Sequence, residues 1–253
     1  MTLRRQLLDR ESLRRFAIAS GGTLDIDTNP PALAHWAWFP DMVEGADLGP
    51  DGHPAPGRVL PATGRARRMF ASARIRFLAP LIVDREAEMS ERIADQRVRP
   101  GKQGAFTLMD VERTIRQNGE TCVIENRTFA FLDHGPPLPL PEVIADKYDW
   151  CPDAVDLFRF SAATFNAHRI HYDLEYARTV EGYPERVVHG PLTAARLAML
   201  AAKRAPLAGF SFRAQAPLFA GQPVRLEIDK DGRCRAVRCD GVVAMDAQAE
   251  WID

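Results

Sequence analysis

One stretch of nine residues in the second half of the chain carries an unusual density of side chains suited to acid–base chemistry. It has the sequence FNAHRIHYD and occupies residues 165–173. Histidine has an unperturbed pKa of about 6.5, so the imidazole of His171 could take up and release a proton near neutral pH. The amide of Asn166, on a folded-back loop, could hold a water molecule against that imidazole. The stretch therefore predicts an acid–base site in which Asn166 and His171 are catalytic.

The same stretch allows two other interpretations. His168, His171 and Asp173, with His189 further along, could ligate zinc. However, the spacing His-x-x-His-x-Asp is not one of the strong zinc patterns, and no cysteine pair supports it. A polar loop with hydrogen-bonded histidines also stays open. We expect no metal ion and no organic cofactor at this site.

A second short segment, HGPL at residues 189–192, could supply electrophilic assistance. Pro191 is typical of the first turn of a helix. The unpaired backbone N–H groups of such a turn gather at the end where the helix dipole favours negative charge. Gly190 would let an acyl oxygen approach these groups closely. A thioester carbonyl placed there would be polarised towards an enolate, which the addition of water across a conjugated double bond requires.

The elements that must position these residues follow from the apolar pattern. Residues 191–205, PLTAARLAMLAAKRA, predict a helix that is apolar on nearly every face and therefore largely buried. The segments that follow it, among them FSFRAQAPLFA, PVRLEI and VVAMDAQAEWI, predict strands joined by DKDG and CDG turns. One buried helix covered by an antiparallel sheet accounts for this order.

The first half predicts similar elements. The N-terminal residues 1–16 are interpreted as helical, and the helix ends at Gly21-Gly22. Residues 73–132 predict strands, with a tight turn at Asn118-Gly119. Proline is too dense in residues 133–145 for helix or sheet. We therefore expect two units, residues 1–132 and residues 146–253, joined by that proline-rich linker.

The two halves align as unequal copies of one repeat. Three pairs of segments match in the same order: FAIASGG with FSAATFN, PATGRARRMF with PLTAARLAML, and RFLAPL with RAQAPL. The arginines of PATGRARRMF, at residues 61–70, cannot form a buried helix like its counterpart. Gly22 stands opposite Asn166, and no histidine follows it closely. We therefore expect the first half to be catalytically empty.

The composition excludes several classes of partner. The net charge is −1, from 33 basic and 34 acidic residues, so no overall field favours nucleic acid or an anionic membrane. No run approaches the roughly 20 apolar residues of a membrane helix. The four cysteines are scattered without a CxxC pair. A reduced, cytoplasmic protein is the simplest interpretation.

These residues resemble a known family. FNAHRIHYD resembles the G-D-x-N-P-x-H-x-D motif of the MaoC-like (R)-specific enoyl-CoA hydratases, and HGPL resembles the start of their central helix. HWAWFPD, GPDGHPAPGRVLP and RRMFASARIRF resemble N-terminal segments of one branch, the 3-hydroxyacyl-thioester dehydratases and 3-methylfumaryl-CoA (mesaconyl-C4-type) hydratases. The resemblance implies an α+β double hot-dog fold, in which each repeat wraps an antiparallel sheet around a central helix, the N-terminal helix being degenerate. It places the chemistry in the second repeat and room for the acyl group in the first.

The motif can be carried over position by position. His171 falls on its catalytic histidine, and Asn166 falls where the wider family has an aspartate. His168 stands at the motif's asparagine, Arg169 at its proline and Asp173 at its second acid. An asparagine can position water but cannot take its proton. Either His171 carries the proton transfers alone, which we favour, or Asp173 substitutes for the lost acid.

Arginines in both halves could recognise a negatively charged substrate. Arg65, Arg67 and Arg68 could bind coenzyme A phosphates or the carboxylate of a dicarboxylic acyl group, or they could form a solvated basic surface. Arg169 could bind a carboxylate or form a salt bridge with Asp173. The residues expected to bind the substrate or its developing oxyanion are Gly190, Arg169, Arg68 and His168.

The predicted function is reversible addition of water to an enoyl-CoA thioester. The resemblance and the arginines favour a branched dicarboxylic acyl group of the 3-methylfumaryl-CoA or mesaconyl-CoA type. A straight-chain 3-hydroxyacyl-thioester dehydratase is the alternative, and an acyl-CoA thioesterase or a non-catalytic acyl-binding module is more distant. We expect a small acyl-CoA molecule as the binding partner, and a homodimer stays open.

Overall fold

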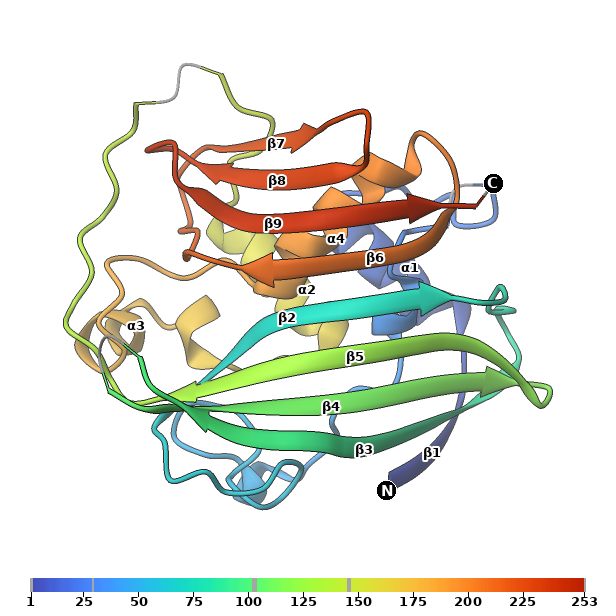
Figure 1. The fold of residues 1–253 in the computed structure, drawn as a ribbon, viewed down its shortest axis with the longest axis horizontal. Coiled ribbons are helices and arrows are strands. Elements are labelled where there is room, and N and C mark those ends of the chain that lie inside the picture. The colour runs from blue at the N-terminus through green and yellow to red at the C-terminus, as the bar shows by residue number, and fades with distance from the viewer. Residues whose placement is uncertain (1, 29, 102–103, 145–146, 253) are drawn as a thin grey trace.

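Nine antiparallel strands form one continuous sheet in the computed structural model, which describes residues 2–28, 30–101, 104–144 and 147–252. The strand order is β1-β3-β4-β5-β2-β6-β9-β8-β7 (Figure 1). The strands are β1 Thr2–Leu7, β2 Arg67–Phe77, β3 Glu86–Arg99, β4 Phe106–Gln117, β5 Glu120–Leu132, β6 Leu207–Ala214, β7 Val224–Ile228, β8 Arg233–Arg238 and β9 Val243–Trp251. The helices are α1 Arg10–Ala19, α2 Ala154–Thr164, α3 Leu174–Thr179 and α4 Gly190–Ala202, with short 3-10 turns η1 Ala34–Ala37, η2 Gly45–Asp47 and η3 Arg169–His171.

The two halves of the chain repeat one strand order about the centre of the sheet. Strands β2 to β5 lie in the order β3-β4-β5-β2, and strands β6 to β9 mirror them as β6-β9-β8-β7. The two sets meet where β2 pairs antiparallel with β6, in a register that sets Arg74 opposite Ser211. This edge-to-edge junction leaves only β1 and β7 as outer edges of the sheet. The double hot-dog fold expected from the sequence is confirmed.

Strands β3, β4 and β5 form where the sequence predicted them, whereas β2 begins earlier than predicted, at Arg67. β4 and β5 are joined by Asn118 and Gly119, whose φ angles are 53° and 82°. Two consecutive positive φ angles are the signature of the two-residue turn that matches the twist of a hairpin, and Asn-Gly adopts it readily. Residues 133–144, the described part of the expected linker, contain no helix or strand.

The predicted apolar helix is α4, and it lies against the sheet of the second half (Figure 1). Small side chains let the helix approach the strands closely, while leucines fill the space between them. Its buried residues are Leu192, Thr193, Ala194, Ala195, Leu197, Ala198 and Ala201. Helices α1 and α2 pack against each other, with the rings of Phe16 and Phe160 6.1 Å apart. The expectation of a buried central helix in the second repeat is confirmed.

One local expectation from the sequence is confirmed and one is wrong. As the arginines predicted, residues 61–70 form no buried helix: residues 61–66 form no helix, and Arg67–Phe70 begin β2, paired with Phe129–Leu132 of β5. Among the described residues between α1 and β2, the first half therefore has no counterpart of α4. At the N-terminus, residues 2–7 form β1 along β3 instead of a helix. Helix α1 begins only after Asp9, whose side chain caps it by accepting from the N–H of Ser12.

None of the helices in the described ranges is both long enough and apolar enough to cross a membrane.

The burial of α4 predicts where the stability of the fold resides. Leu197 is 0 % exposed, so Leu197→Ala leaves a cavity between helix and sheet and should lower the free energy of unfolding by about 2–5 kcal/mol. The matched change Leu24→Ala, at a leucine that is 62 % exposed, should cost about 0.5 kcal/mol or less. Urea unfolding followed by circular dichroism measures both. Equal losses at the two leucines would contradict this account of the core.

Candidate active site

The stretch at residues 165–173 folds into a turn, a short loop and a 3-10 turn. Phe165 ends α2 in the left-handed conformation, with φ 53°, and so reverses the chain. The loop then enters η3, which contains His171, and Asp173 caps α3 by accepting from the N–H of Tyr176. Asp173 therefore marks the start of a helix directly after the turn that contains His171.

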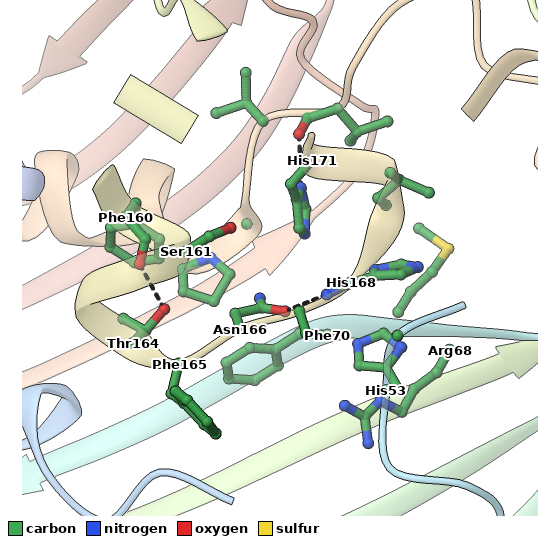
Figure 2. Close-up of a pocket in the computed structure, with 18 of the residues that line it drawn as sticks. His53, Arg68, Phe70, Phe160, Ser161, Thr164, Phe165, Asn166, His168 and His171 are labelled. Carbon is green, nitrogen blue, oxygen red and sulfur yellow. Dashed lines mark hydrogen bonds between the residues drawn. The ribbon is translucent and has the colours of Figure 1, made fainter. Parts of the chain in front are cut away.

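His171 is held in one orientation by the backbone. Its Nδ1 lies 2.7 Å from the carbonyl oxygen of Val187 (Figure 2). A carbonyl only accepts, so Nδ1 carries the hydrogen and Nε2 keeps a free lone pair. Burial lowers the pKa of His171 to about 3, against the opposing effect of the Val187 carbonyl. The imidazole is therefore neutral at pH 7 and can act as a base through Nε2.

Asn166 is held as a hydrogen-bond donor towards the cavity. Its Oδ1 accepts from the backbone N–H of His168 at 3.0 Å (Figure 2). Because that N–H can only donate, the amide oxygen must face it, and the NH₂ group is left for the cavity. Such a group can donate to the oxygen of a water molecule but cannot take its proton.

A second histidine stabilises the position of His171. The ring of His189 stacks on that of His171 with centroids 3.5 Å apart and planes 20° apart. The hydroxyl of Ser161 lies 2.9 Å from Nε2 of His189. Burial, and then the neighbouring His171, lower the pKa of His189 well below its ordinary value, so two neutral rings stack without repulsion. From the sequence alone, His189 is a candidate only as a zinc ligand. The spacing of residues along the chain does not reveal its contact with Ser161.

The first half of the chain contributes a loop to the same site. A Cβ built on Gly52, whose φ is +86°, would lie 1.9 Å from the carbonyl oxygen of Ala167. The carbonyl oxygen of Asp51 accepts from the N–H of Arg169 at 2.8 Å. The ring of His53 lies against that of His168, with centroids 4.0 Å apart. The loop of the first half is therefore docked on the histidine motif, and the expectation that the first half is catalytically empty stays a prediction.

These residues surround one cavity of about 810 Å³ that both halves line. Its polar lining includes His53, Arg68, Asn166, His168 and His171 (Figure 2). Its apolar walls include Trp36, Phe70, Phe129 and Phe160. A large apolar cavity with a few convergent polar groups is the usual form of a small-molecule site.

Gly190 lies at the cavity as the first residue of α4, as the sequence predicted. Pro191 follows it in the first turn, where the N–H groups have no partner within the helix. A Cβ at Gly190 would lie 3.8 Å from the carbonyl oxygen of Phe70, so the two halves of the chain approach each other here. The helix start therefore offers N–H donors to an oxygen bound in the cavity.

The candidate arginines separate into two groups. Arg68 lines the cavity, with its guanidinium 5.5 Å from the centre of the Phe129 ring. Among the residues that the structure describes, no carboxylate oxygen lies within 4.0 Å of its guanidinium, and burial lowers its pKa. Arg65 pairs with Asp133. Arg68 is thus the arginine of its segment that can meet a ligand in the cavity.

Two further candidates do not reach the cavity. Arg67 forms a salt bridge with Glu181 at 2.6 Å. Arg169 forms a salt bridge with Asp173 at 2.7 Å and lies 4.1 Å from the centre of the Tyr176 ring. Neither arginine lines the cavity. The expected contact of Arg169 with substrate is therefore wrong, because the carboxylate of Asp173 binds its guanidinium. Both carboxylate oxygens of Asp173 already accept hydrogen bonds, one from Arg169 and one from the N–H of Tyr176.

One cluster has the composition of a metal site but not the arrangement. Asp51, His53 and His168 offer ligand atoms within 4.8 Å of one another. The two rings, however, lie partly stacked with planes 36° apart, and Asp51 is already bonded to His53 at 2.9 Å. Two imidazoles that share one ion must both aim a ring nitrogen at it. The positive charge of Arg68 also acts on both histidines. These contacts favour a hydrogen-bonded cluster, and the absence of a metal ion here stays a prediction.

Comparison with known proteins finds hydratases and dehydratases by sequence and by structure. The profile of the family "Hydroxyacyl-thioester dehydratase type 2" matches residues 33–220. The chain is 39 % identical to a protein named mesaconyl-C(4)-CoA hydratase from Chloroflexus aurantiacus, over 92 % of this chain and 90 % of the relative. The crystal structure of HtdX from Mycobacterium tuberculosis is similar over 100 % of both chains, with TM-score 0.72 and 17 % identity. A MaoC-like dehydratase from Phytophthora capsici has the same TM-score at 15 % identity, over 100 % of this chain and 95 % of its own.

The contact of Gly52 with Ala167 predicts a position-specific effect. Gly52→Ala and Gly57→Ala both place a Cβ at a positive φ, of +86° and +88°, which costs about 1–2 kcal/mol. At Gly57 the new methyl group meets nothing within 4 Å, whereas at Gly52 it meets the Ala167 oxygen. We expect Gly52→Ala to cost about 2 kcal/mol more in urea unfolding and to shift the ring resonances of His168. Indistinguishable variants would show that the loop is not docked as described.

Proposed function

Because the chain belongs to the hydroxyacyl-thioester dehydratase type 2 family, we propose that it adds water reversibly to the double bond of an enoyl-CoA thioester at the cavity described above. One observation carries this assignment. A neutral imidazole with a free Nε2, at His171, and an amide NH₂, at Asn166, face the cavity at which α4 begins. Water, a base and an oxyanion site are what the reaction requires.

The mechanism follows from the three groups. The Asn166 NH₂ donates to the oxygen of a water molecule, and Nε2 of His171 removes one of its protons. The oxygen forms a bond to the β-carbon as the π electrons move through the α-carbon to the thioester oxygen. The N–H groups at Gly190 stabilise that enolate oxygen. A proton delivered to the α-carbon then completes the 3-hydroxyacyl thioester.

Arg68 supports the finer proposal of a branched dicarboxylic substrate, of the 3-methylfumaryl-CoA or mesaconyl-CoA type. An arginine without a protein carboxylate in an apolar cavity is stabilised when a ligand supplies one. The positive charges of two other arginines that line the cavity are already paired with protein carboxylates, since Arg113 pairs with Glu91 and Arg127 pairs with Glu125. A straight-chain enoyl thioester is the second candidate, favoured by the aromatic walls.

Further features of the proposal come from the sequence. The reaction needs no metal ion or organic cofactor. The four cysteines are free, which supports a reducing compartment such as the cytoplasm. The homodimer stays a prediction, and the mass of the protein in solution tests it.

Substitution of the two motif residues tests the mechanism. The wild type should lower enoyl absorbance without releasing free thiol, since thiol release would indicate a thioesterase. His171→Ala should lower kcat about a hundred- to ten-thousandfold with little change in KM, because it removes the base. Asn166→Ala should cost less, and Asn166→Asp should keep substantial activity. Near-normal His171→Ala together with inactive Asp173→Asn would overturn the assignment.

Substitution of Arg68 tests the substrate class. If Arg68 pairs with a substrate carboxylate, Arg68→Ala leaves that charge unpaired and should cost about 3 kcal/mol or more, roughly a hundredfold in kcat/KM on mesaconyl-type thioesters. Activity on crotonyl-CoA should hold or rise. Arg65→Ala, at an arginine paired with Asp133 outside the cavity, is the matched control and should change neither activity. A wild type that prefers crotonyl-CoA would contradict the dicarboxylate proposal.

A further inference from the structure

The loop from the first half brings a carboxylate–imidazole pair to the cavity. Oδ2 of Asp51 lies 2.9 Å from Nδ1 of His53, and the side chains are 17 % and 14 % exposed. Burial alone would raise the pKa of Asp51, but the hydrogen bond and charge of His53 hold it below its ordinary value. The ionised carboxylate only accepts, so Nδ1 of His53 carries a hydrogen. Nε2 is left for the cavity that His53 lines.

The proposed reaction needs two proton transfers at two different atoms, one at the oxygen of water and one at the α-carbon. Asn166 replaces the carboxylate of the wider family and cannot transfer a proton. Among the described residues, His171 is bonded to a neutral carbonyl and stacked on a neutral ring, so its protonated form is weakly stabilised. An imidazole hydrogen-bonded to a carboxylate stabilises the protonated form much better. Asp51 gives His53 that support.

We propose that His53, held by Asp51, is the second acid–base residue of the site and exchanges the proton of the α-carbon. This inference rests on the proposed hydration. His53 and His171 both line the cavity, and each lies against His168, at ring-centre distances of 4.0 and 5.3 Å. Figure 2 shows the three histidines gathered beside Asn166, with His53 on the segment from the first half.

The steps balance as follows in hydration. His171 accepts a proton from water as the oxygen bonds to the β-carbon and the enolate forms. Protonated His53 gives its Nε2 proton to the α-carbon, and the enolate electrons form the new C–H bond. The sum is addition of one water molecule. The extra proton on His171 then returns to His53 through solvent water in the cavity, which restores both residues.

The charges around His53 set the direction of its pH dependence. Burial lowers the pKa of His53 most and Arg68 lowers it further, whereas Asp51 and, more weakly, Asp41 raise it. The neutral rings of His168 and His171 complete the titratable groups that face it among the described residues. With the net shift downward from 6.5, protonated His53 is more populated at acid pH. Hydration kcat/KM should therefore rise as the pH falls through the range below 6.5.

Three variants test the assignment on the enoyl-CoA that the wild type hydrates fastest. His53→Gln should lower kcat about a hundred- to ten-thousandfold, leave KM within about threefold and remove the rise at acid pH. Asp51→Asn should lower kcat about tenfold or more, because it loses the carboxylate but keeps a hydrogen bond. His53→Ala should regain part of its rate with added imidazole. The matched control His134→Gln, at an exposed histidine outside the cavity, should behave as wild type.

The outcomes separate the two proposals. A folded His53→Gln variant with kcat within about threefold of wild type and an unchanged pH profile would overturn the role of His53 and leave the hydratase assignment intact. A wild type that hydrates no thioester in the panel would overturn both. Loss of activity with EDTA and recovery with Zn²⁺ would instead make Asp51, His53 and His168 a metal site, against this inference.

Discussion

The antiparallel pairing of β2 with β6 brings the two halves of the chain into a single sheet. Hydrogen bonds between these strands satisfy two edges that would otherwise be exposed. The same pairing carries the start of β2, with Arg68 and Phe70, to the N-terminus of α4, where Gly190 approaches the Phe70 carbonyl. The cavity depends on this junction because one half supplies the histidine motif and the helix start, while the other supplies the guanidinium and the aromatic wall.

The difference between the halves explains why there is room for a ligand. In the second half, α4 fills the face of the sheet with alanine and leucine side chains. Among the described residues between α1 and β2, the first half has no such helix, and its segment from Leu33 to Leu60 contacts the sheet instead, where the indole N–H of Trp36 donates to Glu125 of β5. That segment carries Trp36 and the loop with His53 to the cavity. In the second half the helix fills the space on the sheet. In the first half the lack of such a helix leaves room for a ligand.

The sequence predicts local structure here better than long-range contacts. The apolar run of α4, the Asn118-Gly119 turn and the spacing of Asn166 to His171 are local, so pattern and turn chemistry identify them. The stacking of His189 on His171 forms only when the chain folds, and the apolar periodicity of the sequence does not reveal it.

The contribution of the first half is hidden for the same reason. More than a hundred residues separate His53 from His168, and their contact depends on the sheet junction and on a glycine close to another backbone. Arg169 shows the opposite failure, since its place within the motif suggested substrate binding, whereas a local salt bridge with Asp173 holds it away from the cavity.

The outer strands β1 and β7 have a consequence for how the protein behaves at high concentration. An open strand edge invites pairing with another chain, and charged side chains along it oppose such growth. β1 presents Arg4 and Arg5, and β7 alternates Val224, Arg225, Leu226 and Glu227. Fibrous polymerisation by strand addition is therefore disfavoured at both ends of the sheet.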